Sequence, residues 1–549
     1  MVDMPPTAPD NKNNNNGNAL HWHVLGGNNK HRIGANAGFA SYEETGADGV
    51  KKTTRVMLDA GSLIGKSRNA EYPELSGSDN VIPDMSHHFK LKGSADEPPE
   101  PIHSIFLTHN HVDHTGAIPF YILMGYDLPK IYATPYTLKR LEQELSNANI
   151  DPDDWPEMIS IAPGTPVCEG PIKVNAFWVS HSTPQSVGYF IETPEANILH
   201  PGDFKMDPTV VWGPAFSPEQ FKKVTGGKSI DLLLLDSTGA DRDMPTTHEE
   251  DVRGTLRDLM KKHPGKRFII GVMSGYEENV ASVAQVSAEA GRTLWLSGWA
   301  HEQALSALQA TGMSLSDALG QKIGVRVLDK GKAAKDLADA PPGNSVVIVT
   351  GASGAANSVL PRAADGHHPS LKLDKDKDII LLVAPSIPGQ DAQRNSMLAG
   401  LKAKGFQVLT KSEEKLYSHA HARQPELIEF AKLANPKVLM PVHGDTHLRA
   451  ANKEAMEKEG IKTVEADNGD VLRVTKQGVT SINPATKGKP KLVGFQTLQG
   501  RSWTEKNYMQ VNAPQDRPAA LPEPANTNEP APKTKRPKIF TINPPKAAG

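Results

Sequence analysis

Four side chains of metal-ligand type stand within six residues of the stretch FLTHNHVDHTGA. They are His109, His111, Asp113 and His114. Imidazole and carboxylate groups are ligands that zinc takes in proteins, at about 2.0–2.2 Å. His109 and His111 are two residues apart and can point to one centre, whereas the adjacent Asp113 and His114 can point to a second. The spacing therefore predicts the beginnings of two neighbouring metal sites.

Four side chains cannot complete two metal sites, so further ligands are expected elsewhere in the chain. Three candidates follow predicted strands and precede turns: His181, Asp203 and His443. Asp203 is the candidate to bridge two metals, because a carboxylate has two oxygens. Metals about 3.5–4 Å apart can share a hydroxide and clamp a phosphate or carbonyl group. One such residue alone is more typical of an ordinary loop, but together they predict a two-metal hydrolytic centre.

The elements before Ser229 that position these residues are predicted to be mainly strands. Apolar runs over 55–61 and 104–109 predict strands that end near Asp59 and the histidine cluster. The stretch 187–204 reads as a hairpin around the turn TPEAN. Between them, 134–150 has helical spacing. Strand ends that carry polar residues are the usual edge for a site in an α/β protein.

The pattern changes after Ser229 to an alternation of strands and helices. The apolar runs SIDLLLLD, KRFIIGVM, RTLWLSG, SVVIVTG and DIILLVAP predict strands, and amphipathic stretches such as 248–263 and 277–291 predict helices. This alternation predicts an α/β fold in which a mostly parallel sheet carries helices on its faces.

The composition fits a globular protein with sizeable cores, because 38% of the 549 residues are hydrophobic and 22% are charged. No apolar run approaches the ~18 residues of a membrane span, and the N-terminus lacks the pattern of a signal peptide. Cys168 is the only cysteine, so an internal disulfide and a cysteine-based zinc cluster are both excluded. These features predict a cytoplasmic protein with no membrane partner.

Charge is distributed unevenly, although the net charge is only −3. Residues 476–549 contain 12 Lys and Arg against 4 Asp and Glu, so the first 475 residues carry a net charge of −11. The 37 residues from Ala513 include nine prolines and are expected to be disordered. The basic stretch KTKRPK at 533–538 can hold RNA by counterion release. A solvated tail with no partner is the equally weighted alternative.

The motifs together resemble a known superfamily. THNHVDHTG is similar to the His-x-His-x-Asp-His signature of the metallo-β-lactamase superfamily, and DAG, His181 and GDFK follow in the order of its other motifs. LLDST, SHAHARQPEL and PVHGD resemble the three added motifs of its β-CASP branch of nucleic-acid hydrolases. DNVIPDMSH, PSIPGQ and DNGDVL are similar to stretches of the ribonuclease J family. The resemblance covers about residues 24–475.

The resemblance implies a metallo-β-lactamase αββα sandwich with an inserted β-CASP domain. We place a disordered N-terminus at 1–20, the first part of the sandwich at 21–235, the β-CASP domain at 236–380, the completing part at 381–475 and a largely disordered basic tail at 476–549. A folded C-terminal domain that supports dimers in the family has no counterpart in this sequence. Homodimer formation is therefore an open expectation, and the tail is expected to take over RNA binding or self-association.

The resemblance also implies a role for each site residue. His109, His111 and His181 would hold one metal, Asp113, His114 and His443 the other, and Asp203 would bridge them. Asp59 and Asp236 would orient ligands, and His421 would contact the scissile phosphate. Asp113, Asp59, Asp236 and His421 are thus the expected catalytic residues. Two divalent ions are expected as cofactors, with zinc first and manganese as the alternative.

The departures from the family lie in its phosphate pocket. TGASGA at 350–355 replaces the family's TGSQGE, and HAHAR at 419–423 replaces a serine–glycine–histidine–glycine–serine stretch. Ser282 stands where the family has an arginine. The family's Gly-Arg-Ser stretch is replaced by Gly-Trp-Ala at 298–300, which contains Trp299. Trp299 is expected to pack in the core, with base stacking as the alternative. The expected substrate-binding residues are Ser386, His421, Arg423 and Asn279.

The resemblance implies a ribonuclease that hydrolyses single-stranded RNA with a hydroxide activated by two metals. His443 favours RNA, because DNA-processing members of the branch usually have valine there. The family's usual reaction is 5′-to-3′ exonucleolysis, often with endonuclease activity. One alternative is a small-molecule hydrolase on the same fold, which the long insertion between Asp236 and Ile380 disfavours. Another is a non-catalytic RNA-binding protein, which the complete ligand set disfavours.

Overall fold

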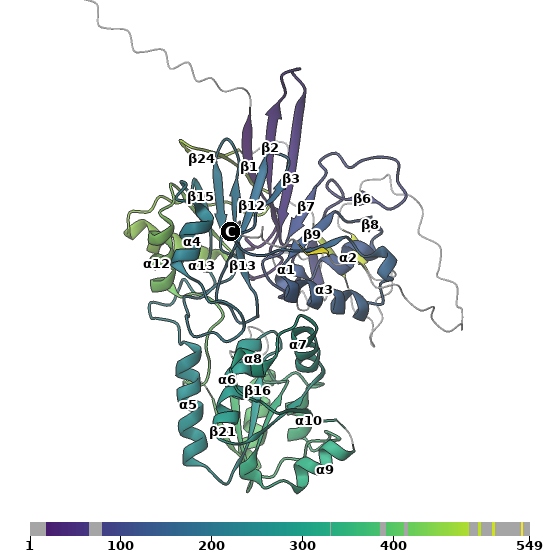
Figure 1. The fold of residues 1–549 in the computed structure, drawn as a ribbon, viewed down its shortest axis with the longest axis vertical. Helices are drawn as coiled ribbons and strands as arrows, with labels where there is room; N and C mark the ends of the chain where they lie inside the picture. The colour runs from purple at the N-terminus through teal and green to yellow at the C-terminus, as the bar shows by residue number, and fades with distance from the viewer. Residues whose placement is uncertain are drawn as a thin grey trace, which may run out of the picture.

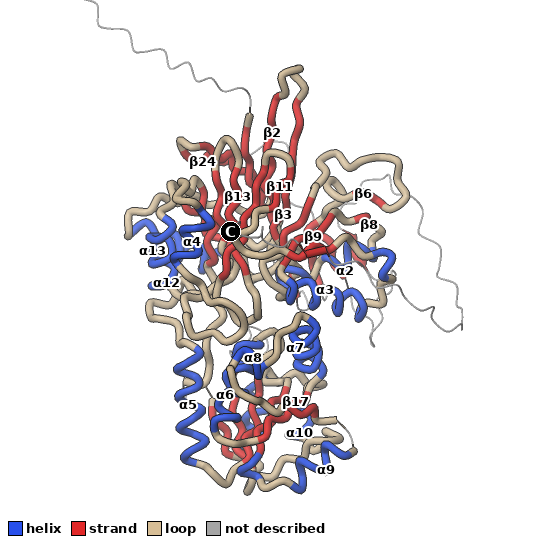
Figure 2. The backbone as a smooth tube through the Cα atoms, in the orientation of Figure 1, coloured by secondary structure: helices blue, strands red, loops and turns tan. Residues whose placement is uncertain are grey.

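The computed structural model describes residues 18–64, 80–329, 331–384, 391–410, 415–482, 492–495, 508–510 and 540–541. Two bodies are visible in Figure 1. The upper body, which we call the sandwich domain, contains the N-terminal strands and two packed sheets. The lower body, which we call the inserted domain, runs from α5 to β21 and contains a third sheet (Figure 2). Among the described residues, no helix is long and apolar enough to cross a membrane.

The first sheet of the sandwich domain has nine strands. In spatial order they are β24 (Gly478–Ser481), β23 (Val471–Thr475), β1 (Ala19–Val24), β2 (Gly38–Thr45), β3 (Lys51–Leu58), β7 (Ser104–Phe106), β9 (Lys130–Ala133), β10 (Met158–Ser160) and β27 (Phe540–Thr541). The strands from β24 to β3 pair antiparallel, and those from β3 to β27 pair parallel. The parallel half therefore brings the carboxyl ends of β3 and β7 to the same edge.

The second sheet of the sandwich domain has six strands. In spatial order they are β11 (Val167–Glu169), β12 (Ile172–Trp178), β13 (Val187–Glu192), β14 (Asn197–His200), β15 (Leu232–Asp236) and β22 (Leu439–Val442). β13 and β14 form the expected antiparallel hairpin, with Glu192 opposite Asn197. The pairings from β14 to β22 are parallel, so β15 and β22 also end at a common edge.

The two sheets pack face to face, and helices cover their outer faces. Trp22, Tyr42, Tyr189 and Leu234 are among the apolar residues buried between them. The helices are α1 (Val112–Thr115), α2 (Ile118–Leu123) and α3 (Pro135–Asn147) beside the first sheet, and α4 (Pro218–Thr225), α12 (Gln424–Ala434) and α13 (Thr446–Lys458) beside the second. The expected order of helix, sheet, sheet and helix is therefore confirmed.

The helix predicted over 134–150 is present as α3, and its buried leucines account for the helical spacing of apolar residues in the sequence. Leu138, Leu141 and Leu145 recur at helical spacing, and all three are at most 1% exposed on the inner face of α3. Pro135 occupies the first turn, where its missing N–H leaves no hydrogen bond unmade. Burying an aliphatic side chain of this size contributes about 1.5–3 kcal/mol.

Short strands border the sandwich domain. A four-stranded sheet contains β26 (Tyr508–Gln510), β25 (Leu492–Phe495), β5 (Asn80–Pro83) and β4 (Leu63–Ile64), and β6 (Lys90–Leu91) pairs with β8 (Tyr126–Asp127). β25 pairs antiparallel with β5. Most of residues 513–549, expected to be disordered, lie outside the described residues.

The inserted domain has a six-stranded sheet in which every pairing is parallel. Its order is β18 (Val325–Val327), β17 (Thr293–Ser297), β19 (Ser345–Val349), β16 (Arg267–Val272), β20 (Asp378–Val383) and β21 (Gln407–Leu409). The helices around it are α5 (Glu249–Lys262), α6 (Glu277–Glu289), α7 (Trp299–Ala310), α8 (Leu315–Ala318), α9 (Lys332–Asp339), α10 (Val359–Ala364) and α11 (Asp391–Ala403). The predicted parallel sheet is confirmed.

The chain passes from the inserted domain back to the sandwich domain later than the sequence predicted. A boundary at 380/381 would fall inside β20, and β21 adds a further strand to the same sheet. The apolar run DIILLVAP is the last clear strand signal of this domain, because β21 is only three residues long and shows no clear alternation. We therefore place the return after Leu409, before α12 rejoins the sandwich domain.

A buried ionic network joins the two domains. The Lys205 ammonium is completely buried and lies 3.0 Å from a Glu249 oxygen, 3.2 Å from an Asp207 oxygen and 2.7 Å from the Ser418 hydroxyl. Glu249 belongs to α5 of the inserted domain, whereas Lys205 and Asp207 follow β14. A buried charge that is paired on several sides holds its partners firmly, because losing any partner leaves an uncompensated charge.

Glu278 of α6 gives this interface a dependence on pH. Its carboxylate oxygens accept hydrogen bonds from the backbone N–H groups of Val211 (2.6 Å) and Trp212 (2.8 Å) in the sandwich domain. Burial, with repulsion from Glu249, raises the pKa of Glu278 from 4.5 to about 8. Between these two values the folded chain keeps a proton that the unfolded chain loses. The contribution of Glu278 to the free energy of unfolding is therefore highest below pH 4.5 and falls as the pH rises from 4.5 to about 8.

We expect Glu278→Gln to flatten this dependence. One proton of difference corresponds to about 1.4 kcal/mol per pH unit, and a glutamine cannot ionise. Thermal or denaturant unfolding at pH 5, 6, 7 and 8 should show a steeper loss for the natural chain than for the variant. The comparison uses the slope of the free energy of unfolding against pH. Absolute stabilities are not compared, because the glutamine side chain has only one oxygen and so loses one of the two hydrogen bonds that Glu278 accepts from backbone N–H groups. Parallel slopes would contradict the assignment to Glu278.

Candidate metal centre

The candidate ligands lie where strands of both sandwich sheets end. His109 follows β7, Asp203 follows β14 and His443 follows β22, and His181 comes three residues after β12. His111 is the residue before α1, so the turn into that helix separates it from His109. Parallel neighbours end at a common edge, and this brings residues from distant parts of the chain to one place.

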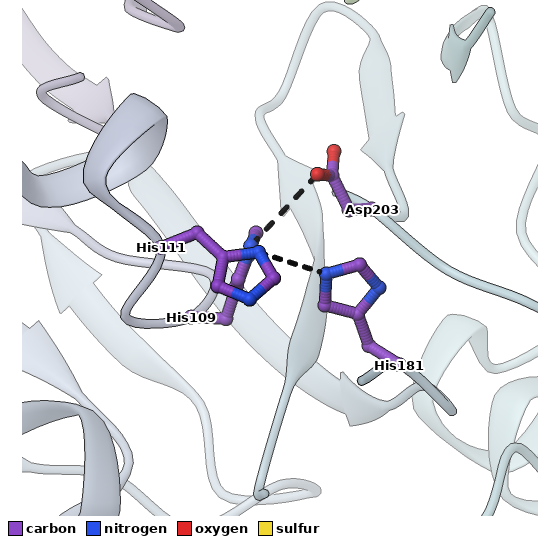
Figure 3. A group of neighbouring side chains, drawn as sticks. All are labelled: His109, His111, His181 and Asp203. Atoms are coloured by element: carbon purple, nitrogen blue, oxygen red, sulfur yellow. Dashed lines mark hydrogen bonds and ion pairs between the residues drawn. The ribbon is translucent and has the colours of Figure 1, made fainter. Parts of the chain in front are cut away.

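The first group of side chains contains His109, His111, His181 and Asp203. One ligand atom from each lies within 4.8 Å of all the others. Figure 3 shows the three imidazole rings and the carboxylate facing one another. His111 Nδ1 is 3.2 Å from His181 Nε2, and His109 Nε2 is 3.8 Å from an Asp203 oxygen.

The second group contains Asp113, His114, Asp203 and His443 under the same distance limit. His443 Nε2 lies 3.2 Å from an Asp113 oxygen, and His114 Nε2 lies 3.1 Å from an Asp203 oxygen. Asp203 thus faces both groups, as expected of a bridging carboxylate.

A third combination of Asp203, Asp236, His421 and His443 also satisfies the distance limit. The hydrogen bonds favour a different role for Asp236 and His421. His421 Nδ1 is 2.8 Å from one Asp236 oxygen, and His443 Nδ1 is 3.2 Å from the other. Asp236 therefore faces the outer nitrogens of two histidines, which suits an orienting carboxylate better than a ligand.

Each histidine of the two groups has one ring nitrogen engaged by the surrounding protein. The partners of the outer nitrogens are the Thr108 hydroxyl for His109 (3.0 Å), the Gly275 carbonyl for His111 (2.8 Å), an Asp59 oxygen for His114 (2.8 Å), the Ala420 carbonyl for His181 (2.8 Å) and Asp236 for His443. Metal-binding histidines commonly make such a bond, because it fixes the tautomer and the ring orientation.

The residues present fit divalent metal ions. His109 Nε2 is buried and has no hydrogen-bond partner among the described residues, although it points into the first group. Asp59, Asp203 and Asp236 are at most 2% exposed around the same centre. Buried carboxylates need positive charge beside them, and an unpartnered imidazole nitrogen is a ready ligand. Divalent cations satisfy both needs at once.

The pKa shifts separate the histidines into two kinds. Burial lowers the pKa of His109 and His181 well below 6.5, so both are neutral, which is the form that binds a metal. Burial also acts on His114 and His443, but nearby carboxylates outweigh it, Asp203 most strongly, and raise the pKa of both well above 6.5. In the absence of a cation, these two rings would supply the positive charge that the carboxylates require.

Asp59 positions the histidine cluster through hydrogen bonds to Thr108 and His114. One oxygen of Asp59 accepts hydrogen bonds from the backbone N–H of Thr108 (2.8 Å) and its hydroxyl (3.0 Å), and the other faces His114. Asp59 has a φ of +57° and His443 a φ of +55°. Such backbone is unfavourable for residues other than glycine, and it persists where the surroundings over-determine it, often at functional sites.

The expected substrate-binding residues are placed in four different ways. His421 is part-buried beside Asp203 and Asp236, at the centre. Asn279 is 1% exposed and donates to both oxygens of Glu249 (3.1 and 3.2 Å), so its amide belongs to the domain interface. Arg423 is 8% exposed and donates to the Pro245 carbonyl (3.1 Å). Ser386 lies outside the described residues.

The placements of Asn279 and Arg423 correct the expectation that both face a nucleotide. Arg253 of α5 and Ser282 of α6 lie 3.3 Å apart beside Glu249, so an arginine from another helix contacts the position where the sequence lacks one. Sequence spacing could not show this, because Arg253 stands 29 residues away in the chain.

Trp299 is not a core residue. It is 54% exposed at the start of α7, directly after the carboxyl end of β17. The stretch 350–355 follows β19, and Gly275 follows β16, so both lie at the same edge of the inserted sheet. Gly275 touches His111, which places this edge of the sheet against the metal centre.

Several supporting residues were not assigned a role from the sequence. The Asn36 side-chain amide nitrogen lies 3.1 Å from His114 Nε2, and the hydroxyl of Thr238, the last residue of the LLDST motif, lies 2.6 Å from His443 Nδ1. Gly275 and Ala420 act through backbone carbonyls, which every residue type possesses. Thr108 and Thr238 were the detectable cases, since Thr108 directly precedes the histidine cluster and Thr238 ends the LLDST motif.

The four-layer sandwich, its metal-ligand edge and the inserted α/β domain define a metallo-β-lactamase-fold hydrolase of the β-CASP type. The comparisons with protein families agree along most of the chain. Residues 80–266 match a beta-lactamase superfamily domain, residues 265–401 match the ribonuclease J beta-CASP domain and residues 410–465 match a Zn-dependent metallo-hydrolase RNA specificity domain. The chain belongs to the ribonuclease J family.

Similar proteins include ribonuclease J of Thermus thermophilus, 28% identical over 76% of this chain and 70% of that protein. Ribonuclease J of Sinorhizobium meliloti is 27% identical over 83% of this chain and 75% of its own length, and ribonuclease J2 of Bacillus subtilis is 27% identical over 77% and 71%. A crystal structure of a protein of unknown function from Enterococcus faecalis has a TM-score of 0.57 and 16% identity, covering 83% of this chain and all of that one. This last likeness concerns the fold alone.

Proposed function

We propose that this protein is a ribonuclease that hydrolyses phosphodiester bonds of single-stranded RNA with two divalent metal ions. One observation carries the proposal: two groups of ligand-type side chains share Asp203, and the outer nitrogen of each histidine is held by the protein. His109, His111 and His181 would hold one ion, and Asp113, His114 and His443 the other. When bound, such a pair supplies a water of lowered pKa and neutralises charge on a phosphate.

His421 is the residue we assign to the scissile phosphate. Its Nδ1 is held by Asp236, and its side chain is 20% exposed, whereas the ligand histidines His109 and His114 are at most 1% exposed. The nitrogen that Asp236 leaves free can donate a hydrogen bond to a phosphate oxygen and stabilise the charge that develops there. Asp236 fixes the direction of this donor before the substrate arrives.

RNA fits the wider surroundings of the site. The exposed Trp299 ring lies at the edge of the inserted sheet that faces the centre, where it can stack on a base. Base stacking on an aromatic side chain contributes about 1–3 kcal/mol and needs no particular sequence. The similarity of residues 410–465 to an RNA specificity domain supports the same substrate class.

We further propose a 5′-to-3′ exonuclease with endonuclease activity, acting in RNA processing or decay in the cytoplasm. Zinc is the first candidate metal, because imidazole and carboxylate donors suit it, and manganese is the second. The relatives named ribonuclease J support the reaction class. Homodimer formation and RNA binding by the basic tail at 533–538 are also part of this proposal.

Three RNA substrates test the proposed function. The metal-loaded chain should degrade linear RNA that carries a 5′-monophosphate, and it should cleave circular RNA more slowly, since a circle offers no end. A linear 5′-triphosphate RNA measures whether the altered pocket still prefers a monophosphate. His111→Ala should remove all three activities, and mass spectrometry should find 5′-phosphates on the products.

RNA that stays intact with zinc and with manganese would overturn the proposal, as would unchanged cleavage by His111→Ala. Turnover of lactones or thioesters without RNA cleavage would support the small-molecule hydrolase instead. RNA binding without products under all metal conditions would support a non-catalytic protein.

A further inference from the structure

The inserted domain touches the metal centre directly, through one backbone carbonyl. Gly275, in the loop between β16 and α6, places its oxygen 2.8 Å from Nε2 of His111, a residue 164 positions earlier in the chain. The other four histidines of the two groups bond to Thr108, Asp59, Asp236 and Ala420, all in segments of the sandwich domain. Among the five, His111 alone takes its partner from the inserted domain.

We infer that the Gly275 carbonyl makes His111 a competent metal ligand, so that metal binding and seating of the inserted domain are coupled. This inference rests on the proposed role of His109, His111 and His181 as ligands of one ion.

The chemistry of the carbonyl fixes the proton of His111. A carbonyl oxygen only accepts hydrogen bonds, so His111 Nε2 must carry the proton. His111 Nδ1 then holds the lone pair, and it faces His181 Nε2 at 3.2 Å inside the first group. Moving the carbonyl away would release the ring to the other tautomer, whose protonated Nδ1 cannot bind a metal.

The loop holds its carbonyl in place by further bonds to the sandwich domain. The Ser182 hydroxyl donates to the Gly275 oxygen at 3.2 Å, and the Glu278 N–H donates to the Ser182 carbonyl at 3.1 Å. The Tyr276 ring stacks near the His111 ring, with centroids 6.1 Å apart. Residues 275–278 therefore contact both His111 and the loop that carries His181.

Glycine is required at position 275 on two counts. Its φ is +84°, a conformation that other residues rarely adopt. An added Cβ would also lie 3.2 Å from both Cδ2 and Nε2 of His111, closer than ordinary contact. Any larger residue would press on the ligand ring itself.

Coupling of this kind is reciprocal. If the seated loop strengthens binding at the first site, an ion at that site must hold the loop more firmly. Residues that support a metal ligand from behind typically change metal affinity by about 10–100-fold when they are altered. The second site, formed by Asp113, His114 and His443, makes no hydrogen bond to this loop among the described residues and should be spared.

Gly275→Ala tests the inference, with Gly312→Ala as the matched control. Gly312 lies in the same domain with a φ of +77°, but nothing lies within 4 Å of its added Cβ. Zinc affinity and stoichiometry are measured by competition with a chromophoric chelator. Gly275→Ala should weaken one of two bound ions about 10–100-fold and leave the other unchanged. Gly312→Ala should bind both ions as the natural chain does.

Equal affinities in Gly275→Ala and the natural chain would overturn the inference while leaving the proposed ribonuclease intact. An equal loss in both variants would also overturn it, since backbone strain alone would then suffice. A natural chain that binds neither zinc nor manganese would instead remove the proposed function and the inference together.

Hydrogen exchange tests the reciprocal effect without any substitution. Adding zinc to the metal-free natural chain should slow exchange of the Glu278 amide, because this N–H donates to Ser182. The amide of Gly312, which donates to Gln309 in the same domain, serves as an internal reference and should not change. Unchanged exchange at Glu278 under saturating zinc would contradict the coupling even if Gly275→Ala failed to fold.

Discussion

Asp203→Asn should reduce the rate of RNA hydrolysis by at least about 10³-fold and lower the bound metal below two ions per chain. One Asp203 oxygen lies 3.1 Å from His114 Nε2, 3.5 Å from His443 Nε2 and 3.8 Å from His109 Nε2. This carboxylate therefore faces both groups of ligands at once. An amide has one oxygen and no negative charge, so it cannot bridge two cations in the same way. Metal content by mass spectrometry and cleavage of labelled RNA measure the two effects.

Asp231→Asn is the matched control for Asp203→Asn. Asp231 is equally buried, at 0% exposure, but it pairs with Lys437 (2.6 Å) and accepts from the backbone of Asn197 (2.8 Å). Its replacement should lower the free energy of unfolding and leave both metals bound. Two tightly bound metals and full activity in Asp203→Asn would show that the shared carboxylate is not a bridge.

His421→Asn should reduce kcat by about 10²–10³-fold without changing the metal content. The hydrogen bond of His421 goes to Asp236 at 2.8 Å, whereas Asp203 lies 3.8 Å from the same nitrogen, and we assign His421 to the phosphate. The loss should appear in kcat more than in KM, because the donor acts most strongly on charge that develops in the transition state. Single-turnover cleavage with metal-loaded protein measures this directly.

His263→Asn controls for the removal of an imidazole elsewhere. His263 ends α5, and asparagine is well tolerated at the end of a helix. This variant should retain full activity. A loss of metal in His421→Asn would place His421 among the ligands, as the third combination of Asp203, Asp236, His421 and His443 would require.

The sequence was most informative where chemistry needs particular side chains at particular spacings. His109, His111, Asp113 and His114 stand out because such a density of ligands has no structural purpose, and the structure brings them together with His181, Asp203 and His443. The parallel sheet of the inserted domain followed from its alternating pattern. Both signals are local, so they survive without knowledge of the tertiary fold.

The sequence was least informative where a backbone group or a distant side chain does the work. The carbonyls of Gly275 and Ala420 support His111 and His181, but a carbonyl leaves no trace in residue identity. Asn279 was expected at the substrate because this chain keeps the asparagine of the family's motif. In the structure its side chain donates a hydrogen bond to Glu249 at the interface between the two domains. Trp299 was expected to be buried because tryptophan usually is, yet it begins a helix at an open edge.

Titration of metal-free protein with zinc or manganese, followed by cleavage of single-stranded RNA, tests the central claim most directly. Protein freed of metal by a chelator should leave the RNA intact, because the buried ligand sets hold no nucleophile of their own. Cleavage should appear as metal is added and reach its maximum at two equivalents per chain. Full cleavage in excess chelator, or a maximum at one equivalent, would contradict a ribonuclease that works with two metals.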